Sequence, residues 1–165
     1  MPKTTNQTRR LTYIPSDKVS DAVNLRILTE LQHDPRLTMS ELGRRVGLSS
    51  PAVTERVRRL EETNVILGYR LQINPAALGL PIAAYVRIRP NPGQLSKIAE
   101  LAQDTPEIVE CHRVTGEDCF ILKVYLPSLD QLDRIPDNFL LYGMTTTSLI
   151  QSSTVPLRPP PLPEA

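Results

Sequence analysis

Residues 38–60, with the sequence TMSELGRRVGLSSPAVTERVRRL, predict two short helices with a sharp turn between them. Thr38 and Glu41 have the spacing of a capping box, in which the threonine side chain accepts a hydrogen bond from the first helical turn. Gly47 follows the first helix and can adopt the left-handed conformation that ends a helix. The stretch therefore predicts a helix that starts at Thr38, a turn at Gly47, and a second helix after it.

The second helix has one apolar and one polar face. Ser49 or Ser50 can cap its start, and Pro51 is tolerated in its first turn because no intrahelical donor is lost there. The inward positions are Val53, Val57 and Leu60. The opposite face carries Pro51, Thr54, Glu55, Arg58 and Glu62. A helix, a glycine turn and a capped helix with a polar face are typical of a helix-turn-helix that binds DNA. The alternative is an ordinary helical hairpin with a solvated charged face.

If the stretch binds DNA, its side chains divide into two groups. Those predicted at the major groove and at the helix entrance are Ser50, Pro51, Thr54, Glu55 and Arg58. Those that flank this face and suit phosphates are Arg44, Arg45 and Arg59. A bidentate contact from Arg58 to a guanine edge is worth about 1–3 kcal/mol of discrimination. For Arg56 and Arg59, ion pairs with Glu55, Glu62 or neighbours are the alternative interpretation.

The composition limits the class of protein. The chain has 165 residues, with 40% hydrophobic and 4% aromatic residues, which predicts aliphatic cores in one domain or two small ones. Residues 1–70 contain 12 Lys and Arg against 8 Asp and Glu, a net charge of +4, whereas residues 71–165 contain 7 against 10, a net charge of −3. The basic half suits DNA. Two cysteines, no signal-like start and no long apolar run predict a soluble, cytoplasmic protein.

The first half of the chain predicts a three-helix domain over residues 19–64. Residues 1–18 are polar and predict a flexible arm. A helix is expected from about Ser20 to Gln32, where Asp34 and Pro35 end it, and it would cover the inner faces of the two later helices. Asn64 can take the left-handed position that glycine usually fills. Residues 65–79 predict a linker strand, with a bend at Gly68.

The second half predicts a separate domain over residues 80–155. Alternating apolar residues predict strands at 82–89, 108–114, 119–126 and 145–155, and helices are expected at 93–103 and, more weakly because of Pro136, at 128–141. The order β-α-β-β-α-β is that of a ferredoxin-like sandwich, so the predicted fold class is α+β: a three-helix winged helix-turn-helix domain plus this sandwich. Residues 156–165 predict a disordered or polyproline tail.

The predicted sheet has two unlike faces. The face expected to carry the helices is fully apolar: Val86, Ile88, Phe120, Leu122 and Val124. The other face is mixed: Ala83, Tyr85, Arg87, Cys119, Ile121 and Lys123. A face too apolar for water and too polar for a core suits a self-interface. We therefore expect a homodimer, or a higher even-numbered oligomer, formed through this domain.

Taken together, these motifs resemble the Lrp/AsnC, or feast/famine, family of transcription regulators over about residues 20–155. The resemblance rests on DPRL at 34–37, on EL and VGLS within 41–49, on ERVRRLE at 55–61, and on VTGEDCF at 114–120. The N-P and L-G pairs at 74–75 and 78–79 match the family's linker. Asn24 stands where the family usually has aspartate, and Asn64 where it usually has glycine.

The resemblance implies a small effector, such as an amino acid, bound at the glycine turn of the second domain. That turn consists of Thr115, Gly116, Glu117 and Asp118. Backbone amides at Gly116 can hold a carboxylate, and Asp118 is the candidate partner of an α-ammonium group. The alternative is a hairpin turn in which Asp118 bonds its own backbone. The family's common aspartate position is Cys119 here, which favours an effector other than leucine, or none.

Metal binding and catalysis find little support in the sequence. Cys111 and His112 are neighbours on a predicted strand and point to opposite faces, so small buried thiols are expected, with His112 on the mixed face. No nucleophile stands beside a base in a recognised motif, so no cofactor and no enzyme activity are expected. The alternative is a siroheme decarboxylase, an enzyme class that resembles this family and acts through histidines and arginines of the second domain; this chain has only two histidines, His33 and His112.

Overall fold

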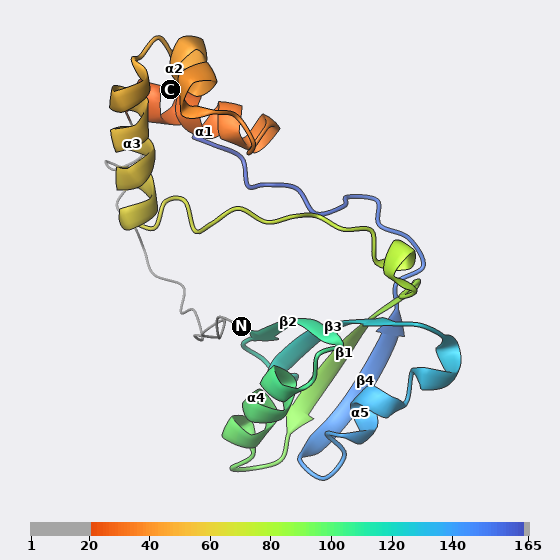
Figure 1. Cartoon of the computed structure of the whole chain (residues 1–165). Coiled ribbons are helices and arrows are strands. Elements are labelled where there is room, and N and C mark those ends of the chain that lie inside the picture. The colour runs from red at the N-terminus through yellow and green to blue at the C-terminus, as the bar shows by residue number, and fades with distance from the viewer. Residues whose placement is uncertain (1–20, 164–165) are drawn as a thin grey trace. The chain divides into compact units, whose positions relative to one another are not determined.

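The structure, a computed structural model, describes residues 21–163 and divides them into two compact units (Figure 1). We call residues 21–71 with 155–163 the helical unit, and residues 72–154 the sheet unit. The predicted N-terminal arm, residues 1–18, lies outside the described residues. Within residues 21–163, no helix is both long enough and apolar enough to cross a membrane.

The helical unit contains the three predicted helices. They are α1 (Ala22–His33), α2 (Met39–Val46) and α3 (Ser50–Glu62). Their inward faces form one aliphatic core of Ile27, Leu28, Leu31, Leu42, Val46, Val53, Val57 and Leu60. The core includes every inward residue that the sequence predicts for α3. The three helices therefore close over a single core, as expected for a small helix-turn-helix domain.

Each of these helices begins with a side-chain cap. Asp21 accepts a hydrogen bond from the Val23 amide at 2.8 Å, and Thr38 accepts one from the Glu41 amide at 3.1 Å. Ser49, rather than Ser50, caps α3 by accepting from the Ala52 amide at 3.4 Å. These caps satisfy amides that have no intrahelical partner. The helix ends follow the sequence too, because Gly47 and Asn64 have positive φ angles of 75° and 58°.

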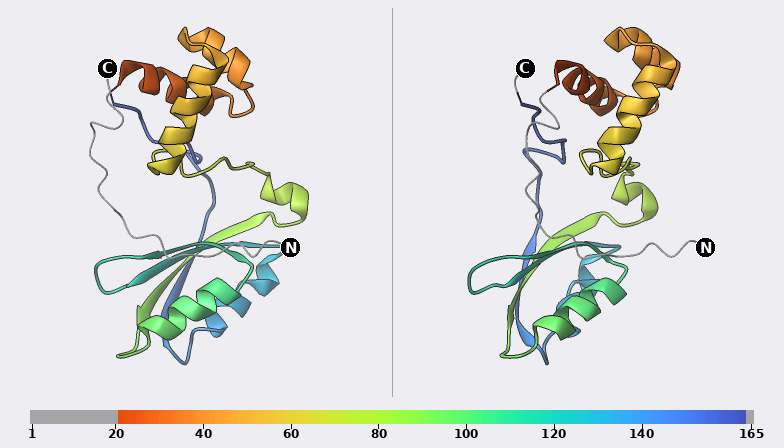
Figure 2. Two further views of the ribbon diagram at one scale, coloured as in Figure 1. Left: turned by 60° about the vertical axis from the view of Figure 1, so that its left-hand side comes forward. Right: turned by 90° about the vertical axis from the view of Figure 1, so that its left-hand side faces the viewer.

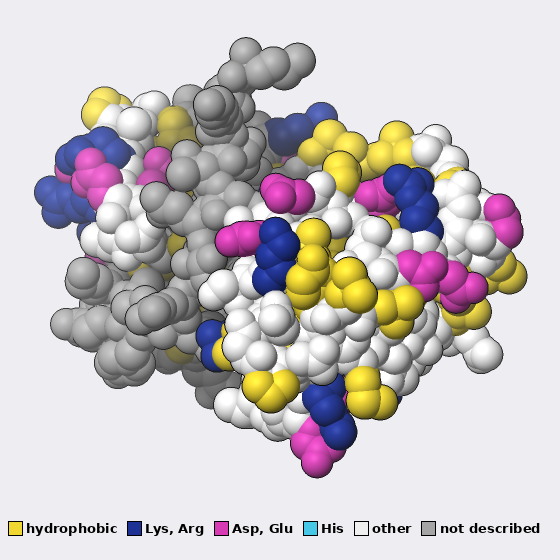
Figure 3. Space-filling model, turned by 90° about the horizontal axis from the view of Figure 1, so that it is seen from below, with side chains coloured by type: hydrophobic (Ala, Val, Ile, Leu, Met, Phe, Trp, Pro, Cys, Tyr) yellow, Lys and Arg dark blue, Asp and Glu magenta, His cyan; other side chains and the backbone are white. Residues whose placement is uncertain are grey.

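The sheet unit has the predicted β-α-β-β-α-β order. Its elements after the short 3₁₀ helix η2 (Pro75–Leu78) are β1 (Ile82–Pro90), α4 (Leu95–Asp104), β2 (Ile108–Arg113), β3 (Phe120–Leu126), the 3₁₀ helix η3 (Leu129–Gln131), α5 (Arg134–Asp137) and β4 (Gly143–Leu149). The sheet order is β2-β3-β1-β4, and all neighbouring strands are antiparallel. Both views in Figure 2 place α4 and α5 on the same side of the sheet. The molecular surface seen in Figure 3 carries apolar and charged side chains interspersed.

The two faces of the sheet differ as the alternation predicts. Val86 lies opposite Leu122, and Ile88 opposite Phe120, and all four side chains are buried beneath the helices. Ile98 of α4, Ile135 of α5 and the later Phe139 complete this core. On the opposite face, Tyr85 is 41% exposed. One face is therefore a packed core, and within the described residues of the sheet unit no helix covers the other face.

The segment from 128 to 155 departs from the prediction. The expected helix over 128–141 is wrong in length, since it is reduced to η3 and one turn of α5. After Pro136 the chain continues through tight i→i+3 hydrogen bonds, such as the Phe139 amide to the Pro136 carbonyl at 2.9 Å, which still bring Phe139 onto the sheet. β4 starts at Gly143, where a Cβ atom would lie 2.4 Å from the Arg89 carbonyl oxygen. It ends at Leu149, six residues earlier than expected.

Two further segments differ from the sequence-based expectation. The predicted linker strand over 65–79 contains no strand; its only regular element is η2. Val65 and Ile66 pack half-buried against the helical core, whereas Leu67, Leu71 and Ile73 after them are exposed, with Leu71 at 85%. The proline-rich tail has no regular secondary structure, but its described part, up to Pro163, belongs to the helical unit.

Candidate nucleic-acid interface and effector turn

The turn between α2 and α3 is held by a close backbone contact. The Leu48 amide donates to the Gly43 carbonyl at 2.8 Å. A Cβ atom at Gly43 would lie 2.7 Å from the Leu48 carbonyl oxygen, so only glycine fits there without a shift of the backbone. The sequence analysis missed this residue, although a glycine inside a helical pattern is itself a sign of close packing. Gly43 and Gly47 together fix the angle at which α3 leaves α2.

The outward face of α3 presents most of the residues predicted to read DNA. Ser50, Pro51, Thr54 and Arg58 are exposed, and Glu55 is half-buried. Val53, Val57 and Leu60 hold the opposite face of the helix in the core. The Thr54 hydroxyl donates to the Ser50 carbonyl at 2.8 Å, which leaves its oxygen lone pairs and methyl group available to a partner. The structure thus brings these five side chains together on one helix face.

The arginines of this face are paired with carboxylates of the same helix. Arg58 donates two hydrogen bonds to Glu55, at 2.9 and 2.7 Å, and pairs with Glu62 on the next turn. Arg59 donates to Glu55 at 3.0 Å. The guanidinium groups of Arg58 and then Arg59 lower the pKa of Glu55 to about 2. The pair expected between Arg59 and Glu55 is therefore formed within α3.

The two arginines of α2 have different surroundings. Arg44 is 76% exposed, and among residues 21–163 it pairs only with Glu41 of its own helix, at 2.7 Å. Arg45 pairs with Glu41 at 3.0 Å and with Glu30 of α1 at 2.9 Å, and its exposed fraction is 41%. Arg45 thus bridges α1 and α2. Of these two predicted phosphate contacts, Arg44 is the freer side chain.

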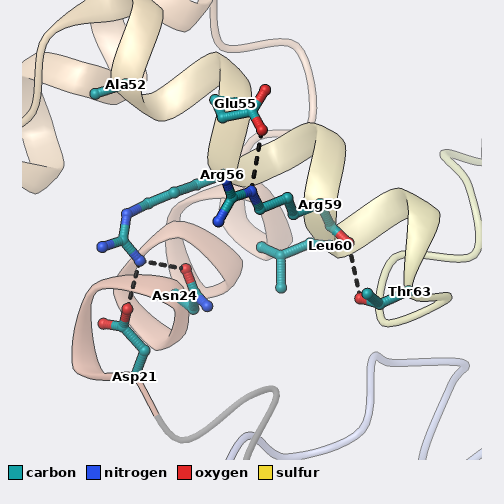
Figure 4. Close-up of a pocket in the computed structure, with 8 residues that line it drawn as sticks. All are labelled: Asp21, Asn24, Ala52, Glu55, Arg56, Arg59, Leu60 and Thr63. Carbon is teal, nitrogen blue, oxygen red and sulfur yellow. Dashed lines mark hydrogen bonds and ion pairs between the residues drawn. The ribbon is translucent and has the colours of Figure 1, made fainter.

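Arg56 links α1 to α3 beside a shallow hollow (Figure 4). Its guanidinium pairs with Asp21 and donates to the Asn24 side-chain oxygen at 2.9 Å. Arg59 and Thr63 line the same hollow, which has Leu60 in its wall. The ion-pair alternative for Arg56 is therefore satisfied by Asp21, a partner that the sequence analysis did not name. Arg56 joins two helices and is not part of the outward face.

The predicted effector turn joins β2 to β3. The Val114 amide donates to the Cys119 carbonyl at 2.9 Å and closes the turn, and Thr115, Gly116, Glu117 and Asp118 form it. Gly116 has a φ angle of 112°, which favours glycine. Glu117 pairs with Arg89 of β1, and Asp118 lies 3.4 Å from Arg87 of the same strand.

Neither interpretation of Asp118 anticipated its contact with Arg87. The antiparallel register of β1 and β3 sets Arg87 opposite Ile121, three residues beyond Asp118, and so brings the arginine beside the turn. The alternation of β1 placed Arg87 on the mixed face, but the pairing of the strands was needed to see this contact. The turn therefore combines backbone amides, a carboxylate and a guanidinium group.

The cysteines are less buried than expected. Cys111 is exposed and Cys119 is half-buried, so the expectation of buried thiols is wrong for Cys111, whose β2 strand lies at the edge of the sheet. Partial burial nevertheless raises the pKa of the Cys111 thiol. His112 lies opposite Ile121 on the mixed face and is 3.5 Å from Glu110. In the part of the chain that the structure describes, no three His, Cys, Asp or Glu side chains are grouped as metal ligands.

Known protein families match both units. Residues 21–61 match the AsnC-type helix-turn-helix domain, and residues 83–160 match the Lrp/AsnC ligand binding domain. LrpC, a transcriptional regulator of Bacillus subtilis, is 36% identical over 132 residues, which cover 80% of this chain and 92% of LrpC. The leucine-responsive regulatory protein of Haemophilus influenzae is 34% identical over 76% of this chain and 77% of its own length.

Solved structures agree with these relatives. The structure of B. subtilis LrpC has a TM-score of 0.77 at 36% identity, covering 81% of this chain and 95% of that one. A feast or famine regulatory protein from Mycobacterium tuberculosis, complexed with L-methionine, has a TM-score of 0.79 at 33% identity, covering 87% and 99%.

A helix-turn-helix unit followed by a ligand-binding unit of this kind defines a transcriptional regulator that binds DNA. The chain belongs to the Lrp/AsnC family. The predicted fold class and family are confirmed, and so is the expectation of a regulator rather than an enzyme. Nothing in the site or among these relatives supports the decarboxylase alternative.

Proposed function

We propose that this regulator binds specific DNA sequences as a homodimer or larger even-numbered oligomer, and that an amino acid modulates it. The observation that carries the proposal is the outward face of α3, where Ser50, Pro51, Thr54 and Arg58 are exposed while the opposite face is fixed in the core. A rigid helix with exposed donors and acceptors suits the major groove. In this proposal the Arg58 guanidinium breaks its ion pairs with Glu55 and Glu62 when DNA binds and then forms hydrogen bonds with a base edge.

Base reading and phosphate binding by this face can be separated with two substitutions. Arg58→Ala is expected to reduce discrimination between the specific site and random DNA roughly tenfold or more, because a bidentate base contact is lost. Arg44→Ala is expected to weaken all sequences alike and to lower the salt dependence by about one counterion. Lys97→Ala on α4 serves as the control. Gel-shift titrations at several salt concentrations measure both effects. If the protein shifts no DNA at low salt, including its own upstream region, the proposal fails.

A two-fold symmetric dimer implies inverted half-sites separated by whole turns of DNA, about 10 base pairs apart. The sheet face opposite α4 and α5 supports such a dimer, because Tyr85, Ile121 and Tyr125 lie there beside Lys123. Ile121→Asp would place a charge in this interface. Light scattering should then give smaller particles with unchanged circular dichroism, whereas Lys97→Glu on the helix side should leave the size unchanged. An unchanged mass for Ile121→Asp would place the interface elsewhere.

The effector is proposed to bind at residues 115–118. The amides near Gly116 and the guanidinium of Arg87 suit a carboxylate, and Asp118 suits an ammonium group. The L-methionine complex of the M. tuberculosis relative supports an amino acid as the ligand class. Cys119 at the position usual for aspartate favours an effector other than leucine.

Isothermal titration against the twenty amino acids tests this site. Asp118→Ala is expected to weaken the binding of the effector at least tenfold, while Asp104→Ala, an exposed carboxylate at the end of α4, should leave it unchanged. Undiminished binding by Asp118→Ala would remove Asp118 from the site. No binding by the unmodified protein would leave the turn a purely structural element.

A further inference from the structure

The C-terminal segment, residues 155–163, packs with the helical unit although the chain reaches it from the sheet unit. The sheet unit ends at residue 154, and the residues that follow group with α1, α2 and α3. Leu162 is half-buried and packs against the aliphatic core of the helical unit. The Gln32 side-chain amide, on α1, donates to the Pro160 carbonyl at 3.3 Å. The tail, predicted to be disordered or polyproline, is therefore docked on the helical unit.

The composition of the segment favours such docking. Pro159, Pro160, Pro161 and Pro163 fix the backbone φ angle near −65°, so less conformational entropy is lost on binding than for an ordinary chain. A proline-rich backbone has no internal hydrogen bonds and offers its carbonyls to outside donors, as Pro160 offers its carbonyl to Gln32. Leu162 supplies the apolar anchor. Leu157, five residues earlier, is 77% exposed and makes no such contact.

We propose that residues 155–163 form a second link between the two units, clipped onto α1 of the same chain by Leu162 and Pro160. The helical unit is then joined to the sheet unit both through the linker after Asn64 and through the tail after β4. One half-buried leucine and one hydrogen bond would be weak between separate molecules. They suffice here because the covalent connection keeps the tail at a high effective concentration, of millimolar order.

The link gives the sheet unit a direct path to the DNA-binding helices. The tail follows β4, and β4 pairs along its length with β1, the strand that carries Arg87 beside the effector turn. A change in the sheet unit that pulls or loosens the tail would act on α1, where the tail is docked. Arg45 joins α1 to α2 through Glu30, and Arg56 joins α1 to α3 through Asp21. The inference does not depend on which effector binds, or on whether one does.

The absence of tryptophan from the sequence allows a direct test of the docking. Leu162→Trp in the full chain introduces a single fluorophore at the docked position, and Leu157→Trp introduces one at an exposed position of the same tail. We expect Leu162→Trp to emit at shorter wavelength and to be quenched less by acrylamide than Leu157→Trp. Equal, solvent-like emission and quenching of the two variants would overturn the docking, unless the larger ring itself prevents it.

A second measurement removes that ambiguity. Leu162→Asp and the control Leu157→Asp are compared by hydrogen exchange of the full chain. Loss of the docked leucine should speed exchange in the C-terminal half of α1 roughly fivefold, the factor for about one lost aliphatic contact, while the control should match the unmodified protein. Unchanged exchange in Leu162→Asp overturns the proposal, whatever the fluorescence shows.

Cross-linking tests whether the tail binds its own chain. With Cys111→Ser and Cys119→Ser as background, Gln32→Cys and Pro160→Cys are introduced together and treated with a short bismaleimide. A link within one chain should leave the denatured protein at monomer mass, with a cross-linked peptide that contains both positions. A covalent dimer as the main product would show that the tail joins two chains, which would overturn the link proposed here.

Discussion

The arginines on the outward face of α3 and the arginines of β1 in the sheet unit are held in different ways. On α3, Arg58 and Arg59 pair with carboxylates three or four residues away on the same helix. In the sheet unit, Arg87 and Arg89 of β1 pair with acidic residues of the β2–β3 turn, the second pair spanning 28 residues. Local pairs leave the helix intact when they break. Pairs between distant segments hold a loop against a strand.

This difference suits two kinds of ligand. An arginine held by its own helix can exchange a carboxylate for DNA without disturbing the fold, and the fold of α3 depends instead on its core and caps. If the proposed zwitterionic effector binds at the turn, the arginines there would have to shift their ion pairs, so binding would change the sheet unit. The contrast assumes that each unit has its own stability, which the separate cores indicate.

The largest expected effect tests whether each unit has its own stability. Leu42 and Leu122 are both fully buried, one in each core. Leu42→Ala should destabilise the helical unit, and Leu122→Ala the sheet unit, each by about 2–5 kcal/mol. Hydrogen exchange during denaturant titration measures the two units separately. If either substitution destabilised both units equally, the chain would unfold as one body and the comparison would not hold.

A smaller effect would sharpen the view that the helical unit depends on its caps. Thr38→Ala removes the acceptor for the Glu41 amide and should cost the helical unit about 0.5–2 kcal/mol. Thr146→Ala is the control: it also removes a threonine hydroxyl, but Thr146 lies on the exposed side of β4 and caps no helix. The same exchange measurement reports both. Equal losses in the two variants would mean that the cap contributes nothing beyond the substitution itself.

The ion pair at the turn should contribute less. Arg87→Gln removes the charge facing Asp118, and a partly exposed pair of this kind contributes about 0.2–1 kcal/mol. The expected sign is faster amide exchange at residues 115–118 with little change in the rest of the sheet. Arg134→Gln, which removes a pair with Glu107, is the control. If the amides of residues 115–118 exchange as slowly in Arg87→Gln as in the unmodified protein, Arg87 does not hold the turn.

The smallest effect concerns the pH dependence of α3. The folded-state pKa of Glu55 is lowered from 4.5 to about 2, so its pairs stabilise the helix fully above pH 4.5 and stop doing so as the pH falls through about 2. In Glu55→Gln, unfolding of the helical unit should depend less on pH over this window. Glu100→Gln on α4 is the matched control. If the stability of the helical unit changes with pH in the same way in Glu55→Gln and in the unmodified protein, the pairing of Glu55 is contradicted.

Sequence patterns predicted most of the architecture because caps, glycine stops and alternation act over a few residues. Thr38, Gly47, Ser49 and Asn64 all act locally, and the sheet faces follow from a period of two. The departures depend on distant contacts. Phe139 reaches the sheet without a long helix, and Leu162 docks on helices more than a hundred residues earlier.

The candidate site shows the same division. The outward face of α3 follows from helical periodicity, so its exposed residues could be named in advance. Arg87 beside Asp118 depends on strand register, and the Asp21 partner of Arg56 depends on how α1 packs on α3. Gly43 inside a helical pattern indicates close packing, but that it approaches the Leu48 carbonyl depends on how the chain turns after α2.

The paired carboxylates on α2 and α3 also govern how the protein would search for its site. Glu41, Glu55 and Glu62 neutralise Arg44, Arg58 and Arg59 while no DNA is bound, so the field of this face is weak beyond a Debye length of about 8 Å at physiological salt. Long-range steering then adds little to the association rate. In the proposed mode of binding, random DNA would be held loosely, and the arginines would leave the glutamates only at close range, where a matching base sequence can compete for them.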